Sequence, residues 1–136
     1  MAIINIDPAN EETPYKADID ISELIKLEEV MTHFNLGPNG GLIYCMEFLE
    51  RNISWLVDKL EHVKKKYLLI DCPGQVELYT HNDSVRNILN HLEKHVRLCA
   101  VNLGNFFFSS KLLNLPLKIG CRDGLFKAYL SKLKRR

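Results

Sequence analysis

The sequence predicts an α/β fold in which a parallel β-sheet is covered by helices on both faces, giving three layers. Two observations favour this fold. Residues 2–7, 67–71 and 97–103 form short apolar runs, which are typical of strands buried on both faces. The segments between them repeat apolar residues every three or four positions, which is typical of the helices that connect parallel strands.

Three helices are expected between these strands. The first begins at Asp20, with Glu23 at the spacing of a capping box. The second is a long helix with a regular apolar stripe, formed by Leu42, Met46, Leu49, Ile53, Leu56 and Leu60. The third follows Asp83 or Ser84, and its apolar face holds Val85, Ile88, Leu89 and Leu92.

The composition excludes several classes of protein. The 136 residues are 46% hydrophobic and 26% charged, which is ordinary for a soluble domain. The apolar runs are far shorter than the roughly 20 residues of a membrane span, and the first 12 residues do not resemble a secretory signal. The four scattered cysteines (Cys45, Cys72, Cys99 and Cys121) favour free thiols over a zinc site. We therefore expect no membrane partner.

The charge is divided unevenly along the chain. Residues 1–103 hold 10 Lys and Arg against 16 Asp and Glu, whereas residues 104–136 hold 8 against a single Asp. The second segment also lacks a clear apolar period, although residues 125–136 fit a basic amphipathic helix. The asymmetry predicts a separate origin or role for this tail.

The strongest chemical signal is the segment YLLIDCPGQVEL at residues 67–78. An apolar strand that ends at Asp71 and is followed by Gly74 and Gln75 resembles the Walker-B and switch arrangement of P-loop GTPases. The resemblance implies that Asp71 holds Mg²⁺, that Gly74 brings its N–H to the γ-phosphate, and that Gln75 orients the attacking water. The alternative is a simple turn at the end of a strand, which Asp, Pro and Gly all favour.

A second signal lies at residues 36–50, LGPNGGLIYCMEFLE, where a Gly-rich stretch unsuited to regular structure precedes the long helix. Together with residues 71–81, DCPGQVELYTH, it resembles the GPN-loop GTPases, small dimeric P-loop GTPases of eukaryotes and archaea. Residues 4–25 also resemble the segment after the P-loop in that family. The amino-acid sequence of these segments is most similar to the second of three eukaryotic paralogues.

The resemblance assigns roles to further residues. Gly37, Pro38 and Asn39 match the loop that names the family, which reaches into the partner's nucleotide site and would place Asn39 near the γ-phosphate. Asp7 and Asp20 match acidic positions near the metal and the attacking water, so Asp7 is a candidate catalytic residue and Asp20 a candidate metal ligand. The alternative for Asp20 is a helix cap, and for residues 39–40 an ordinary turn.

The chain also departs from the family pattern. It contains no G-x-x-x-x-G-K-[ST] loop and no N-K-x-D or T-K-x-D motif. We therefore expect residues 1–103 to be a partial domain, truncated at both ends, whose sheet lacks its first strand and P-loop. Residues 104–136 are expected to lie outside the family pattern, either as intron read-through or as a genuine alternative C-terminus that binds a membrane, a nucleic acid or an import receptor.

Two functions from different classes follow from the resemblance. The first is Mg²⁺-dependent GTP binding and hydrolysis, in a homodimer or with a paralogue, in the assembly and nuclear import of RNA polymerase II. This implies a cytoplasmic protein that shuttles to the nucleus, with polymerase subunits or assembly factors as partners and no direct contact with nucleic acid. The second is a non-catalytic dimerisation module, because the chain alone is expected to bind GTP very weakly.

Overall fold

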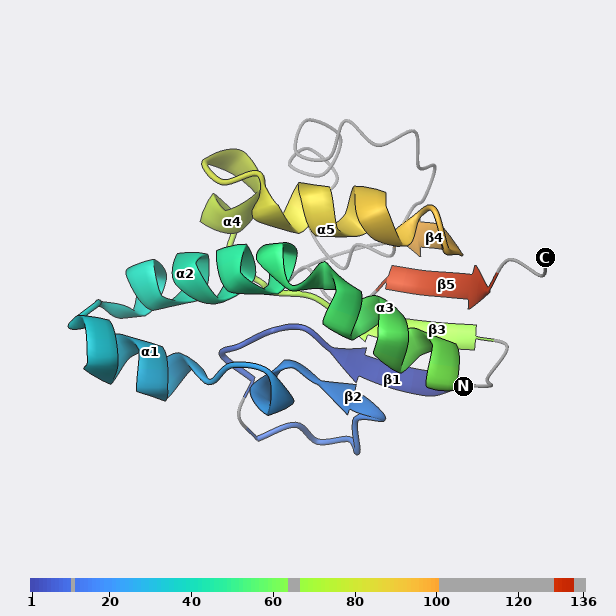
Figure 1. The fold of residues 1–136 in the computed structure, drawn as a ribbon, viewed down its shortest axis with the longest axis horizontal. Helices are drawn as coiled ribbons and strands as arrows, with labels where there is room; N and C mark the ends of the chain where they lie inside the picture. Colours follow the sequence, from blue (N-terminus) through green and yellow to red (C-terminus); the bar gives the residue numbers. More distant parts are fainter. Residues whose placement is uncertain (11, 64–66, 101–128, 134–136) are drawn as a thin grey trace.

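A five-stranded sheet forms the centre of this computed structural model, which describes residues 1–10, 12–63, 67–100 and 129–133 (Figure 1). The strand order is β2-β1-β3-β5-β4. The strands are β1 (Ala2–Asn5), β2 (Ile19–Asp20), β3 (Tyr67–Asp71), β4 (Val96–Ala100) and β5 (Tyr129–Leu133).

The β2-β1-β3 part of the sheet is parallel, as predicted. Ile4 pairs with Ile19 of β2 on one side and with Ile70 of β3 on the other. The pairing continues beyond β1, where the Ile6 N–H donates to the Asp71 carbonyl at 2.9 Å. The carboxyl ends of these three strands therefore lie at the same edge of the sheet.

The other half of the sheet differs from the prediction. β4 does not pair directly with β3, because β5 lies between them and runs antiparallel to both. The backbone of residues 129–133 is extended, so the basic helix expected there is wrong for these residues. The domain boundary predicted at residue 103 and the rest of the tail lie outside the described residues.

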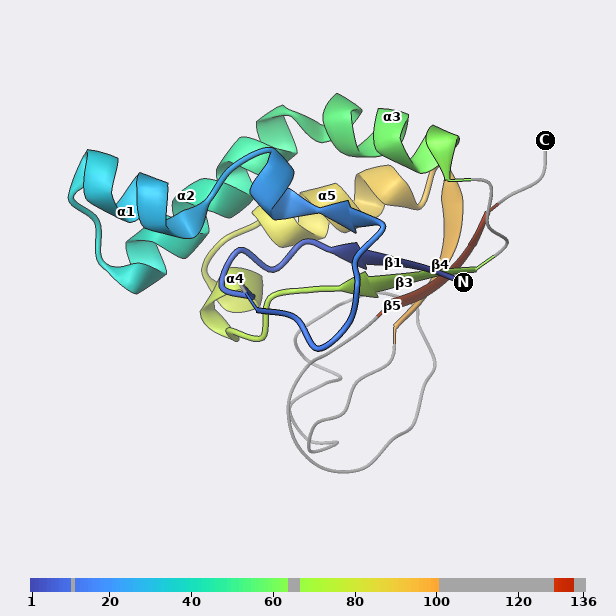
Figure 2. The same ribbon diagram turned by 90° about the horizontal axis from the view of Figure 1, so that it is seen from below.

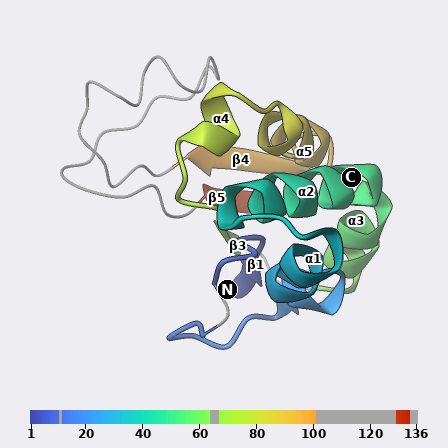
Figure 3. The ribbon, with the colours of Figure 1, turned by 90° about the vertical axis from the view of Figure 1, so that its left-hand side faces the viewer.

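The helices pack against one face of the sheet. They are α1 (Leu27–Phe34), α2 (Pro38–Arg51), α3 (Ile53–His62), α4 (Glu77–Thr80) and α5 (Ser84–Leu92), together with the 3₁₀ turn η1 (Ile21–Glu23). Figures 2 and 3 show α2, α3 and α5 on the same side of the strands. The α/β class is thus confirmed, and within the described part of the chain the helical layer covers a single face.

Two predicted helices are broken into shorter pieces. Asp20 caps η1 instead of an α-helix, and α1 begins only at Leu27. The long helix ends at Arg51, and at Asn52 both the backbone N–H and the side-chain amide donate to the Phe48 carbonyl, at 3.1 and 2.8 Å. α3 then continues from Ile53 in a new direction (Figure 1).

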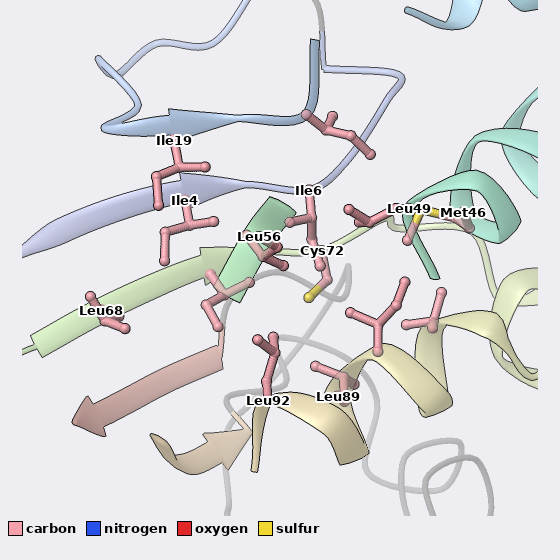
Figure 4. Close-up of a cluster of buried hydrophobic side chains, with 14 of the residues drawn as sticks. Ile4, Ile6, Ile19, Met46, Leu49, Leu56, Leu68, Cys72, Leu89 and Leu92 are labelled. Atoms are coloured by element: carbon pink, nitrogen blue, oxygen red, sulfur yellow. The ribbon is translucent and has the colours of Figure 1, made fainter. Parts of the chain in front are cut away.

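One hydrophobic core joins the sheet to the helices (Figure 4). Its largest fully buried side chains are Ile4, Ile6, Ile19, Ile21, Met46, Leu49, Leu56, Leu68, Ile70, Leu78 and Ile88. Every apolar position predicted for the third helix is buried, since Val85, Ile88, Leu89 and Leu92 are each at most 1% exposed. No helix of the described residues is long and apolar enough to cross a bilayer.

Candidate nucleotide and metal site

Three predicted acids gather at the carboxyl edge of the parallel strands. Asp71 is the last residue of β3, Asp20 is the last residue of β2, and Asp7 follows β1 by two positions. Asp71 and Asp7 are buried, at 5% and 8% exposure. The register that pairs β1 with both neighbours brings these carboxylates together from segments that are far apart in the sequence.

The two oxygens of Asp71 have different surroundings. Oδ2 accepts a short hydrogen bond from the Tyr15 hydroxyl and another from Asn10 Nδ2 at 3.0 Å. Asn10 Nδ2 also lies 3.3 Å from the Tyr15 oxygen, so the three groups form a closed triangle. Oδ1 is buried and has no hydrogen-bond partner among the described residues. A buried carboxylate oxygen in this state is suited to bind a cation or a water molecule.

Asn5 links the other two acids to this triangle. Its Nδ2 donates to Asp20 Oδ2 at 3.1 Å and to the Asn10 carbonyl at 3.4 Å, and its Oδ1 accepts from the Asp7 N–H at 3.1 Å. Asn5 is 1% exposed, so these bonds are shielded from water. Asn5, at the end of β1, therefore holds in place the acidic edge, which consists of Asp7, Asp20 and Asp71.

The segment after Asp71 is braced from α4. Tyr79 donates its hydroxyl proton to the Pro73 carbonyl at 2.7 Å in a buried position. This bond fixes the backbone just before Gly74 and Gln75. The side-chain oxygen of Gln75 is buried without a hydrogen-bond partner among the described residues. Gln75 thus resembles Asp71 in presenting a buried polar atom that has no hydrogen-bond partner among the described residues.

The acidic edge shifts the pKa values of neighbouring groups. Burial raises the pKa of the Tyr15 hydroxyl, and its hydrogen bond to Asp71 raises it further. Burial also raises the pKa of the Cys72 thiol, with added contributions from the charges of Asp71 and Asp7. Both groups stay protonated and neutral at neutral pH, so neither adds negative charge to the three acids.

The Gly-Pro-Asn segment is more regular than its composition predicts. Gly37 is the N-cap of α2, Pro38 is its first residue, and the helix continues through Asn39 and both following glycines. Proline suits this place because the first N–H of a helix has no partner within the helix. A Cβ at Gly41 would lie 2.8 Å from Leu27 and Met31, so this glycine lets α1 and α2 pack closely.

The structure does not bring the Gly-Pro-Asn segment to the acids of the same chain. α2 begins at the far end of the α1–α2 hairpin, well away from the carboxyl end of β3 (Figures 1 and 2). Gly37, Pro38 and Asn39 are all exposed there. The predicted site residues thus form two groups, an acidic edge with the segment that follows it and a separate exposed hairpin tip.

Sequence reasoning missed three residues of the acidic edge. The apolar run at residues 2–7 includes Asn5, and no predicted motif assigns a role to Asn10 or Tyr15. The available signal was the spacing of polar side chains around a strand end, in NIDPAN at residues 5–10, where Asn favours bonds to nearby backbone. Nothing in that spacing shows that Tyr15 turns back to Asp71, because the contact spans 56 positions.

Comparison with known proteins identifies the family. A family model described as a conserved hypothetical ATP binding protein matches residues 1–118. GPN-loop GTPase 2 of Danio rerio is 56% identical over 104 residues, covering 76% of this chain and 33% of that protein. The chain belongs to the GPN-loop GTPase family. GPN-loop GTPase QQT1 of Arabidopsis thaliana is 51% identical over 127 residues, covering 85% of this chain and 42% of that protein.

Relatives from two paralogous groups match this GPN-loop GTPase chain. GPN-loop GTPase 3 of Mycosarcoma maydis is 52% identical over 103 residues, covering 74% of this chain and 37% of that protein. The chain therefore spans between a third and just over two fifths of the length of these curated relatives.

The residues present fit a magnesium ion of the kind that GTPases use. Mg²⁺ is held by one or two carboxylates together with waters and substrate phosphates, and seldom by a cage of protein ligands alone. Asp71 offers one buried oxygen without a partner, in agreement with this mode. Across the described residues no group of three His, Cys, Asp or Glu side chains is placed to hold a metal by itself.

Asp20 is less suited than Asp71 to bind a metal directly. Its Oδ1 accepts from the Ser22 N–H at 2.8 Å as the N-cap of η1, and its Oδ2 accepts from Asn5. The capping alternative is therefore present in the structure. With both oxygens engaged, Asp20 contributes to the negative charge of the edge from a position that is already hydrogen-bonded.

Proposed function

We propose that this chain supplies the Walker-B and switch part of a site that binds and hydrolyses GTP with Mg²⁺. The observation that supports this most is the state of Asp71, a buried carboxylate at the end of a parallel strand with one oxygen left without a partner. In open α/β sheets, ligands bind outside the carboxyl ends of the strands, which is where the three acids gather.

Each residue of this edge has a role in the proposal. Asp71 holds the magnesium ion, which neutralises charge on the β- and γ-phosphates. Gly74 offers a backbone N–H to the γ-phosphate, and Gln75 orients the attacking water with its unpartnered side-chain oxygen. Asp7 lies next to this place, buried and hydrogen-bonded through its Oδ1 to the Ala9 N–H, as a candidate acceptor for the proton of that water.

The first test is binding of a fluorescent GTP analogue to the chain, with and without Mg²⁺. We expect weak binding that Mg²⁺ strengthens and that Asp71→Asn weakens at least about tenfold, because a neutral amide no longer attracts the cation. Asp58→Asn is the matched control, since Asp58 is an exposed carboxylate on α3. An affinity for the GTP analogue that changes neither with Mg²⁺ nor with Asp71→Asn would refute the proposal.

A second function is supported by the hairpin tip. Asn39 is exposed and far from the acids of its own chain, and a Cβ at Gly37 would meet no atom within 4 Å. None of the described residues therefore requires glycine at position 37. We propose that the tip inserts into the nucleotide site of a partner, either a second copy or an intact paralogue, in which case the chain acts as a dimerisation module.

The two functions are separated by mixing the chain with an intact GPN-loop GTPase and measuring GTP hydrolysis by that enzyme. A change in its rate that is lost on Asn39→Ala supports the module. Asn90→Ala serves as the control, because Asn90 is an exposed asparagine on α5. A hydrolysis rate that stays constant at every ratio of the two proteins argues against insertion of the tip.

The cellular role stays a proposal that rests on the family. We propose that the complete protein takes part in the assembly and nuclear import of RNA polymerase II, from the cytoplasm and with shuttling to the nucleus. Polymerase subunits and assembly factors are the proposed partners, with no direct contact to nucleic acid. Affinity purification of the full-length protein from cells tests this, and recovery without any polymerase subunit would contradict it.

A further inference from the structure

We infer that Tyr15 and Asn10 position Asp71 for the cation, by holding Oδ2 so that Oδ1 alone is presented to the metal. This inference rests on the proposed function, because it assigns residues outside the recognised motifs to the same metal site. The two residues belong to the connection between β1 and β2, which was not expected to take part in the chemistry.

The geometry indicates that the two carboxylate oxygens of Asp71 have different roles. Oδ2 receives two donors, the Tyr15 hydroxyl and Asn10 Nδ2, whereas Oδ1 is buried and receives none from the described residues. A carboxylate that was only structural would be expected to distribute its donors over both oxygens, because a buried oxygen without a partner is costly. Fixing one oxygen also fixes the direction of the other.

Tyr15 and Asn10, called the clamp below, are themselves held in place by neighbouring groups. Thr13 donates its hydroxyl proton to the Tyr15 carbonyl at 2.6 Å, and the Asn10 carbonyl accepts from the buried amide of Asn5. The Asn10 N–H also donates to the Asp7 carbonyl at 3.2 Å, which closes the turn after β1. The orientation of Asp71 is therefore tied to β1, so movement of this connection would be transmitted to the metal-binding oxygen.

The test is Mn²⁺ binding, measured from the electron paramagnetic resonance signal of the free ion, in the full chain with GTP present and absent. Residues that orient a metal ligand typically contribute about 10–100-fold to metal affinity, so we expect Tyr15→Phe and Asn10→Ala each to weaken Mn²⁺ binding at least about tenfold. Tyr44→Phe is the matched control, because Tyr44 lies on α2 in contact with other aromatic rings.

A spectroscopic readout separates positioning from a general loss of structure. Metal binding next to Tyr15 should give a near-ultraviolet tyrosine difference spectrum in the wild-type chain and in Tyr44→Phe, and none in Tyr15→Phe. Circular dichroism establishes that each variant is folded. If Tyr15→Phe does not fold, Asn10→Ala alone decides, since it removes one donor to Oδ2 and leaves the phenol in place.

The outcomes distinguish this inference from the proposed function. Wild-type affinity in both Tyr15→Phe and Asn10→Ala, with affinity lost in Asp71→Asn, overturns the positioning role and leaves the metal site standing. Wild-type affinity in Asp71→Asn, or no Mn²⁺ binding by the unsubstituted chain, overturns the metal site and this inference with it. Weaker binding in the clamp variants, with Tyr44→Phe unchanged, supports both.

Discussion

Two adjacent glycines in the first turn of α2 should respond to alanine in opposite ways. At Gly40 an added Cβ would lie 3.6 Å from the nearest side-chain atom, in Leu36, which is an ordinary contact. At Gly41 it would lie 2.8 Å from Leu27 Cδ1 and from Met31 Cγ. Carbon atoms normally approach to about 3.5–4.0 Å, so α1 must move or its side chains must leave their preferred conformations.

The magnitudes follow from these contacts. Replacing glycine by alanine inside a helix stabilises it by about 0.5–1 kcal/mol, because alanine has less backbone freedom to lose. Gly40→Ala should therefore raise the free energy of unfolding by that amount. At Gly41 the same gain is opposed by overpacking, which typically costs about 1–3 kcal/mol. Gly41→Ala should consequently be less stable than Gly40→Ala by about 1–3 kcal/mol.

Urea denaturation followed by circular dichroism measures both variants, at matched protein concentration. Gly37→Ala is an internal control with an expected change near zero, because the smaller backbone freedom of alanine at a φ of −70° is offset by its weaker preference for the N-cap position, and no atom crowds it. Equal stabilisation by Gly40→Ala and Gly41→Ala would refute the reasoning, since it would show that α1 and α2 do not approach closely at Gly41.

Three further results are expected. Leu56→Ala removes a fully buried side chain between α3 and the sheet and should cost about 2–5 kcal/mol in urea denaturation, whereas a cost under about 1 kcal/mol would show that the site is loosely packed. Tyr79→Phe leaves the buried Pro73 carbonyl without its donor and should cost about 1–3 kcal/mol, seen as a lower urea midpoint at unchanged slope. Burial raises the pKa of Cys45 from 9.0 to about 11, so stability should be retained below pH 9 and lost as pH rises towards 11, when the unfolded chain ionises first. In alkaline urea titrations Cys45→Ala should flatten this loss, and an unchanged slope would contradict the cause.

The sequence predicted the structure best where a local pattern of apolar residues alone determines which residues are buried. The run at residues 67–71 becomes β3 with the same bounds, and the four apolar positions of the third helix all enter the core. These signals depend on burial alone, which the order of apolar residues reports directly. Asp71 follows from the same pattern, because it ends an apolar run, whereas Asp7 and Asp20 are assigned through the resemblance to the family. The parallel strands bring all three acids to one edge.

The pattern of apolar residues did not predict the long-range hydrogen bonds or the helix breaks. α2 ends at Asn52, whose side-chain amide donates to the Phe48 carbonyl, although the apolar stripe continues across this position. β5 depends on backbone pairing with β3 and β4, which are distant in the sequence. The clamp on Asp71 reaches it from Tyr15, across a connection that reads as an ordinary polar loop. In each case the structure depends on a specific polar contact, which the periodicity of apolar residues does not reveal.

The rigidity of the α1–α2 hairpin bears on how its tip functions. α2 is anchored by Leu42, Met46 and Leu49, all at most 3% exposed, and the two helices pack closely through Gly41. The hairpin therefore has no free hinge with which to bring Asn39 back to Asp71 of its own chain. If Asn39 acts on a nucleotide, that nucleotide belongs to another protomer. The same geometry implies that Gly41→Ala, which crowds Leu27 and Met31 of α1, should weaken any effect of the chain on a partner enzyme even though Gly41 itself is buried.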